Sequence, residues 1–387
     1  MSRLIYLDNA ATTYPKPFSV LETVYRANRK YAYNSGRGGY RESVQTAEKI
    51  FAVRDCLGRF FHCPEQNIVF TNNCTTAVNT ALKGLLKPGD HVLISALEHN
   101  AVFRPIYKLA REGRITYDQV PYHPDPDRFL QNIRALEQPN TAMVAMLHAS
   151  NVFGVVHPLG LVGDYCRQKG WLFVVDAAQS AGILPIDMQA MHISALCAPG
   201  HKSLFGTMGT GVLALADGIS PDSLTEGGTG SRSFDPQMPP DLPDRLEAGT
   251  HNMPGIAGLL EGLRYVQTQG TERILTHERR LIRQAAAGLS RIPGVTVYGD
   301  GGAVQAGVLS FQIDGMDCEA VGEALGARGI AVRAGLHCAP SAHKKFGTLP
   351  GGTVRLAPSL FTSRAEVAET CRILRACAAS GGRQGVK

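Results

Sequence analysis

Short apolar runs alternate with segments of helical periodicity from about residue 67 onward. The apolar runs include NIVFT, HVLIS, TAMVAMLH and WLFVVDAAQ, and they are interleaved with helical stretches such as TTAVNTALKGLL and HNAVFRPIYKLAREG. Alternation of this kind indicates βαβ units, which form a mostly parallel sheet with helices on both faces. The pattern therefore predicts an α/β fold.

A polar cluster follows each of these apolar runs. TNNCTT comes after IVF, EHN after HVLISAL, HASN after MVAML, and DAAQS after LFVV. In open α/β sheets, ligands bind at the carboxyl ends of the strands. The shared position of the clusters indicates a ligand site at that edge of the sheet.

The pattern changes after a proline-rich stretch, DPQMPPDLP at 235–243, which predicts a surface crossing. Beyond it we expect a helical region at about 254–290, short strands such as VLSFQI and GTVRL, and a final helix that begins with a capping box of Ser363 and Glu366. A chain of 387 residues is long enough for two lobes. We expect an N-terminal segment that packs near this ligand site (1–20), a large domain (21–250) and a smaller α+β domain (251–387).

Composition narrows the functional classes. The formal net charge is +6, but the basic residues are scattered, which argues against a nucleic-acid surface and fits small anionic ligands. The nine cysteines include no CxxC pair, so neither a disulfide framework nor a structural zinc module is indicated. The N-terminus lacks the apolar core of a signal peptide, and no stretch has the length of a membrane span. We expect a cytoplasmic protein that contacts neither nucleic acid nor membrane.

The glycine-rich turn APGHKSLFGTMGTGVLA places Lys202 next to His201. A lone lysine in a loop is ordinarily a solvated surface residue. Asp176, however, stands at the end of the strand WLFVV, where a carboxylate needs a cationic partner. Pyridoxal phosphate requires both groups: a lysine that forms its Schiff base and a carboxylate that keeps its ring nitrogen protonated.

Two further clusters suit the same cofactor. Thr75 and Thr76, at the start of a helix, could bind its phosphate, although Thr75 could equally be an ordinary N-cap. His99 could stack on its ring, although a lone histidine at a strand end is more often structural. Because all these groups follow successive strands, we predict pyridoxal phosphate as the cofactor.

Eight motifs carry a resemblance that covers nearly the whole chain. They are YLDNAATT (6–13), TTAVNTAL (75–82), EHNAVFRP (98–105), HASNVFG (148–154), VVDAAQSAG (174–182), GHK (200–202), RLEAGTHN (245–252) and RAGLHCAP (333–340). In this order they resemble the class V aminotransferase family of fold-type I pyridoxal phosphate enzymes, and within it the cysteine desulfurases and selenocysteine lyases. The resemblance implies a large domain with a mostly parallel seven-stranded sheet and a smaller α+β C-terminal domain.

The resemblance also assigns cofactor-binding roles to matching positions. Lys202 would form the Schiff base, and His201 would bind the phosphate. Asp176 would pair with the ring nitrogen, Gln179 would bond the phenolic oxygen, and His99 would stack on the ring.

Substrate and subunit contacts are implied in the same way. Asn151 would lie between the cofactor and the substrate carboxylate, and Arg355 would bind that carboxylate with its two-pronged guanidinium. Arg333 is a further candidate for binding the substrate. Thr250 would reach the phosphate of the neighbouring subunit, so a homodimer is expected.

The sequence departs from the family pattern at several places. Pro199 stands where many relatives have a phosphate-binding serine, Cys74 where a glycine is common, and Tyr40 where some relatives carry a histidine near the substrate. The stretch EGGTGSRSFDP (226–236) differs from the best-known desulfurases. These positions set the chain apart within the family it resembles.

Cys338 is the residue from which we infer which of the reactions of this fold the chain performs. It lies in the loop AGLHCAPSAHKKFGTLPGG near Arg333, His337, His343 and two lysines, and such positive neighbours favour a thiolate. The alternatives are an inert buried cysteine and a metal site formed with the two histidines. A metal site usually has a second pair of ligands, which is missing, so we predict no metal. RAGLHCAP resembles the RxGxHCA segment of the second group of desulfurases, which has a short catalytic loop.

We therefore expect a cysteine desulfurase that converts L-cysteine to L-alanine and passes sulfur from a Cys338 persulfide to a small acceptor protein. Lys202 would remove the α-proton, and the Cys338 thiolate would attack the substrate sulfur. One alternative is the release of selenium from selenocysteine. Others are a lyase, transaminase or epimerase reaction in which Cys338 is incidental, and a protein that binds pyridoxal phosphate without turnover.

Overall fold

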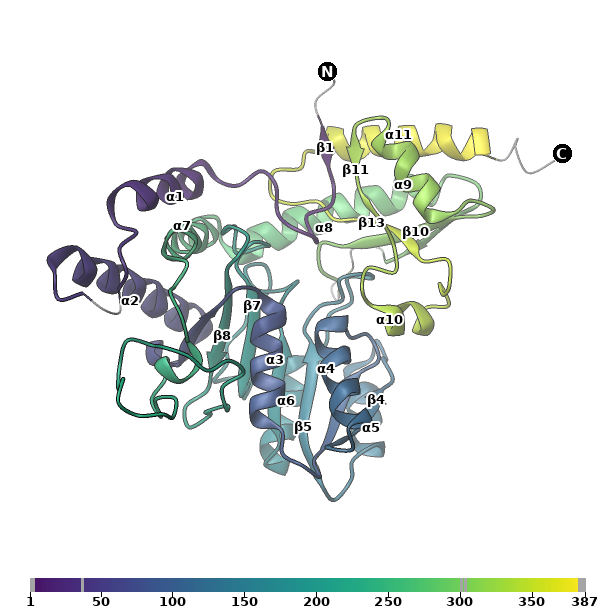
Figure 1. Ribbon diagram of the computed structural model, residues 1–387. Helices are drawn as coiled ribbons and strands as arrows, with labels where there is room; N and C mark the ends of the chain where they lie inside the picture. The colour runs from purple at the N-terminus through teal and green to yellow at the C-terminus, as the bar shows by residue number, and fades with distance from the viewer. Residues whose placement is uncertain (1–3, 36–37, 300–301, 303–304, 382–387) are drawn as a thin grey trace.

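The computed structural model describes residues 4–35, 38–299, 302 and 305–381 (Figure 1). At its centre is a seven-stranded sheet in which every neighbouring pair is parallel except the two that involve β8. The prediction of an α/β fold with a mostly parallel seven-stranded sheet is confirmed. The strand order is β2 (Ile68–Thr71), β8 (Gly211–Leu215), β7 (Ala195–Pro199), β6 (Leu172–Asp176), β5 (Thr141–Leu147), β3 (His91–Ser95) and β4 (Thr116–Val120).

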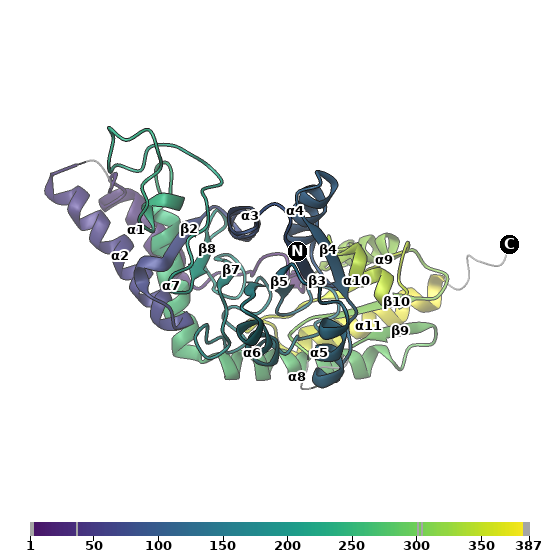
Figure 2. The ribbon, with the colours of Figure 1, turned by 90° about the horizontal axis from the view of Figure 1, so that it is seen from below.

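Helices cover both faces of this sheet (Figure 2). The helices of this lobe are α1 (Phe18–Lys30), α2 (Arg41–Phe61), α3 (Cys74–Leu85), α4 (Asn100–Arg111), α5 (Pro126–Ala135), α6 (Leu159–Lys169) and α7 (Met253–Gln269). Leu93 packs in the core with α2, α5, α6 and α7, whereas its neighbours Val92 and Ile94 pack in the core with α3 and α4. Both faces are apolar, which is why the strands read as continuous apolar runs. None of the helices in the described ranges is long and apolar enough to cross a membrane.

A second lobe contains a four-stranded antiparallel sheet in the order β12 (Arg333–Gly335), β13 (Thr353–Leu356), β10 (Leu309–Ile313) and β9 (Val295–Tyr298). Helices α8 (Thr271–Leu289), α9 (Cys318–Gly326) and α11 (Arg364–Gly381) surround a separate core that includes Leu281, Phe311 and Leu374. The short helix α10 (Pro340–Lys345) follows Cys338. The predicted capping box of the last helix is confirmed, because Ser363 and Glu366 each bond the other's backbone N–H.

The helical region expected at 254–290 is two helices, because Gly270 adopts a positive φ of 79° and separates α7 from α8. Helix α7 contributes Ile256 and Leu263 to the core of the large lobe, whereas α8 contributes Leu281 to the core of the second lobe. We therefore propose that the boundary between the large and the small domain lies at Gly270 rather than at residue 250.

The N-terminal segment crosses between the two lobes. Strand β1 (Ile5–Tyr6) pairs in parallel with β11 (Ile330–Ala331) of the second lobe, and Leu7 packs in that lobe's core. Helix α1 then lies along α7 on the large lobe (Figure 1). The residues between β1 and α1 are hydrogen-bonded to segments that follow β6 and β7, so they pass beside the carboxyl edge of the large sheet.

Candidate active site

A cavity of about 120 Å³ lies at the carboxyl edge of the large sheet. Its walls come from the segments that follow β2, β3, β5, β6 and β7, which is the arrangement that the polar clusters predict. Seven residues that we expect to bind the cofactor line it: Thr75, His99, Asn151, Asp176, Gln179, His201 and Lys202.

Lys202 lies in the turn after β7, and Asp176 is the last residue of the neighbouring strand β6. Burial lowers the pKa of the Lys202 amine, and the Asp176 carboxylate opposes that shift. Asp176 Oδ1 accepts hydrogen bonds from the backbone N–H of Ala178 at 2.8 Å and from Cys74 Sγ at 3.5 Å. A lysine of lowered pKa near a fixed carboxylate has the properties of a nucleophilic amine.

His99 is the N-cap of α4, where its Nδ1 accepts the backbone N–H of Ala101 at 3.0 Å. This bond fixes the orientation of the ring and places its proton on Nε2. Burial lowers the pKa of His99, so the imidazole is neutral at pH 7. A neutral ring of fixed orientation suits stacking on a flat aromatic ligand.

Asn73, and not Thr75, is the N-cap of α3. Its side-chain oxygen accepts the backbone N–H of Thr76 at 2.9 Å and the Thr76 hydroxyl at 3.2 Å. The alternative in which Thr75 caps this helix is therefore wrong. Thr75 lines the cavity that contains Lys202, whereas Thr76 lines a neighbouring cavity together with Thr250.

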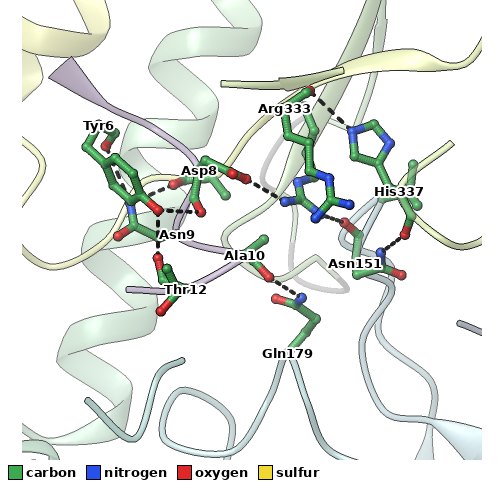
Figure 3. Close-up of polar contacts among 12 residues, drawn as sticks. Tyr6, Asp8, Asn9, Ala10, Thr12, Asn151, Gln179, Arg333 and His337 are labelled. Atoms are coloured by element: carbon green, nitrogen blue, oxygen red, sulfur yellow. Dashed lines mark hydrogen bonds and ion pairs between the residues drawn. The ribbon is translucent and has the colours of Figure 1, made fainter. Parts of the chain in front are cut away.

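Two amide side chains in the cavity wall bind neighbouring segments (Figure 3). Gln179 Nε2 donates to the Ala10 carbonyl at 2.9 Å, and Asn151 Nδ2 donates to the His337 carbonyl at 2.7 Å. Asn151 Oδ1 is buried without a hydrogen-bond partner. This oxygen is available as an acceptor for a ligand.

Arg355, on β13, is only 2% exposed. Its Nη2 pairs with Asp8 Oδ1 at 2.6 Å, its Nη1 donates to the Asn151 carbonyl at 2.9 Å, and its Nε is buried without a partner. Burial lowers the pKa of Arg355, and Asp8 opposes that shift. Arg333 lies opposite Arg355 on β12, and it is exposed. The structure thus holds Arg355 on two sides and leaves N–H groups for a carboxylate.

Cys338 is the one exposed cysteine among the nine, all of which lie in the described ranges. Two hydrogen bonds dock its loop on the large lobe: the backbone N–H of Asn100 donates to the Cys338 carbonyl at 2.7 Å, and Asn151 donates to the His337 carbonyl. His337 and Cys338 both adopt positive φ, 50° and 57°, a region that side chains disfavour. The loop therefore presents an accessible thiol from a constrained backbone next to His99.

The two histidines near Cys338 make contacts within the second lobe. Their rings stack with centroids 5.8 Å apart. His337 Nε2 donates to the Arg333 carbonyl at 3.2 Å, and His343 Nδ1 bonds Thr348 Oγ1 at 2.7 Å. In the part of the chain that the structure describes, no group of three or more His, Cys, Asp and Glu side chains could hold a metal ion.

Three residues contact the site although no such contact was predicted from the sequence. Asp8 pairs with Arg355, Cys74 contacts Asp176, and Lys16 Nζ donates to the His201 carbonyl at 2.5 Å. Asp8 lies in the motif YLDNAATT, and Cys74 lies at a position that departs from the family pattern. Neither observation predicts which residue the side chain contacts.

The chain belongs to the aminotransferase class-V family, whose model matches residues 5–369. Members of this family depend on pyridoxal phosphate. A probable cysteine desulfurase from Methanothermobacter thermautotrophicus is 32% identical over 373 residues, which cover 94% of this chain and 92% of that protein. A cysteine desulfurase from Synechococcus elongatus is 32% identical over 353 residues, 89% of this chain but 56% of that protein. The apo structure of a cysteine desulfurase from Thermococcus onnurineus NA1 superposes with a TM-score of 0.87 at 29% identity, covering 97% of this chain and 95% of that one.

Proposed function

We propose that the chain is a pyridoxal phosphate-dependent cysteine desulfurase, which converts L-cysteine to L-alanine and carries the sulfur as a persulfide on Cys338. One observation carries the proposal: the cavity that contains Lys202, Asp176 and His99 lies beside a docked loop with an exposed thiol. The relatives named cysteine desulfurase support it.

The residues around the cavity fit the cofactor. His201 Nδ1 is buried without a partner, and Thr75 lies in the first turn of α3, so an imidazole and a helix N-terminus are both available to a phosphate. Asp176 would hold the ring nitrogen, Gln179 the phenolic oxygen, and His99 the ring face. When bound, pyridoxal phosphate supplies a sink for the electron pair that remains at Cα after the α-proton is removed.

The chain's own residues would perform the remaining steps. Arg355 would bind the substrate carboxylate through its remaining N–H groups, with Asn151 beside it. Lys202 Nζ would accept the α-proton, since its lowered pKa leaves more of the amine unprotonated. Cys338 Sγ would bond to the substrate sulfur while the Cβ–S bond breaks. A persulfide would remain on the protein, and proton return to the carbon skeleton would give L-alanine.

A homodimer is part of the proposal. Phe18, Leu21 and Tyr25 are spaced three and four residues apart on α1, so they share one face, and they are 77%, 52% and 60% exposed. An apolar face of this kind is typical of an interface, and a second copy of the chain would cover it. Thr250 lines cavities other than the one that contains Lys202, as expected of a residue that serves the partner's phosphate.

Transfer of the sulfur to a small acceptor protein in the cytoplasm completes the proposal. The exposure of the Cys338 thiol supports direct docking of an acceptor over the loop. Leu336 and Leu349 of the same loop are 37% and 45% exposed and would form an apolar rim for such a partner.

The test is to supply the purified protein with pyridoxal phosphate, L-cysteine and a reductant, and to measure alanine and sulfide. Equal amounts of alanine and sulfide from the wild type, and neither product from Lys202→Ala, would support the desulfurase activity. Pyruvate in place of alanine would indicate a lyase, and a bound cofactor without any turnover would indicate a binding protein. L-selenocysteine, run in parallel, decides whether selenium release is the faster reaction.

A further inference from the structure

Three hydrogen-bond donors from the N-terminal segment converge on the backbone carbonyl of His201. Lys16 Nζ lies 2.5 Å from this oxygen, and Thr12 Oγ1 and the Thr13 N–H both lie 3.2 Å from it. A carbonyl oxygen has two lone pairs, so three donors saturate it. We refer to Thr12, Thr13 and Lys16 as the carbonyl clamp.

The carbonyl clamp acts on the peptide unit that leads into Lys202. Because a peptide unit is planar, a fixed carbonyl oxygen also fixes the plane that contains the Lys202 N and Cα atoms. On the other side, the Lys202 carbonyl accepts the Phe205 N–H at 2.8 Å. Both peptide units that flank Lys202 are therefore held, which limits the direction in which its side chain leaves the backbone.

Lys16 is the strongest member of the clamp. No ion pair joins its ammonium group to a carboxylate anywhere in the described ranges, and its hydrogen bond to His201 is charge-assisted. Lys16 is half-buried, and burial lowers its pKa to about 8. A cation held away from water without an anionic partner is costly, so its position next to Lys202 calls for a role beyond surface charge.

We propose that Lys16 is a positioning residue for Lys202, acting through the His201 carbonyl and not through contact with cofactor or substrate. The inference rests on the proposed function, which gives Lys202 the role of the cofactor-binding amine. It extends that function to the N-terminal segment, whose Ala10 also holds Gln179.

The experiment compares four variants of the protein loaded with pyridoxal phosphate. Lys16→Met keeps the length of the side chain and removes the ammonium, Lys16→Arg keeps a charged donor, and Thr12→Val removes one neutral donor. The exposed Lys87 provides the matched control, Lys87→Met. The pH midpoint of the bound cofactor's absorbance is measured for each variant, together with kcat and KM for L-cysteine at pH 7, where the Lys16 ammonium is mainly protonated.

Lys16→Met should shift the pH midpoint and lower kcat by about tenfold or more, the scale of one lost hydrogen bond to a charged group. KM should change by less than about twofold, because Lys16 does not touch the substrate. Thr12→Val should change the pH midpoint and kcat in the same direction as Lys16→Met, but by less. Lys16→Arg and Lys87→Met should keep both values near those of the wild type. A merely structural role would lower the thermal stability of the cofactor-free protein and leave the midpoint unmoved.

An unmoved midpoint and kcat in Lys16→Met would overturn the inference. If Lys16→Met does not fold, Thr12→Val provides the test instead. An unchanged pH midpoint in Thr12→Val would also overturn the inference. Failure of the proposed function is distinguishable, because borohydride treatment of the wild type would then fix the cofactor to a peptide other than APGHK, or to none.

Discussion

Asp8→Asn tests how the buried guanidinium of Arg355 is held. Asp8 Oδ1 lies 2.6 Å from Arg355 Nη2, and the two side chains are 19% and 2% exposed. The substitution removes the negative charge and keeps an oxygen that can still accept the N–H. The substitution therefore distinguishes the effect of the charge of Asp8 from the effect of its size and shape.

The substitution should lower the stability of the fold without weakening substrate binding. Breaking a buried ion pair outright costs about 3–5 kcal/mol. The amide keeps one acceptor, and Nη1 still donates to the Asn151 carbonyl, so we expect about half of that loss, roughly 2 kcal/mol. The substrate carboxylate would meanwhile meet a guanidinium whose charge is no longer balanced by Asp8, so its binding should be unchanged or tighter.

Two measurements check this prediction. Urea unfolding of the cofactor-free protein should show a lower midpoint for Asp8→Asn than for the wild type, and KM for L-cysteine should be equal or lower. The exposed Asp217 gives a control, Asp217→Asn, which should alter neither. A KM raised tenfold at an unchanged urea midpoint would refute the reasoning, because Asp8 would then serve the substrate directly.

Two further predictions concern buried carboxyl groups. Asp176→Asn should still bind the cofactor, seen by its absorbance, but turnover should fall about a hundredfold or more through lost charge stabilisation; an unchanged rate would make Asp176 a structural acid. Burial raises the pKa of Glu278 to about 8 from 4.5, so the native state keeps a proton that the unfolded state loses, and this group lowers stability as the pH rises from 4.5 to 8. Glu278→Gln should therefore show a smaller drop in urea midpoint between pH 5.5 and 8.5 than the wild type, and equal drops would contradict the assignment.

The residues that line the cavity could be predicted because the sheet topology largely determines where they lie. In a parallel sheet the carboxyl ends of successive strands meet at one edge, so clusters far apart in the sequence, such as those of His99, Asp176 and Lys202, share one cavity. Cys338 could be placed on a loop but not against Asn100 and Asn151. That contact depends on how the second lobe docks on the first, and no local pattern encodes the docking.

The helix boundaries that differ from the prediction lie where the local sequence is compatible with more than one structure. In TNNCTT each of several neighbouring residues is a good N-cap, and in the structure Asn73 caps the helix. Gly270 interrupts a helical pattern that a single helix could tolerate, and its positive φ of 79° ends α7 in the structure. The pairing of Asp8 with Arg355 spans 347 positions, beyond any spacing rule.

The most direct test of the account is to find where the sulfur goes. Wild-type protein loaded with cofactor is treated with L-cysteine, alkylated and digested, and the persulfide is located by mass spectrometry. We expect a persulfide on the peptide with Cys338 and on none of the other eight cysteines. We also expect that Cys338→Ala folds, binds the cofactor and loses several orders of magnitude in alanine production, because no other nucleophile can take the sulfur. A persulfide on a different cysteine, or near-normal alanine production by Cys338→Ala, would contradict it.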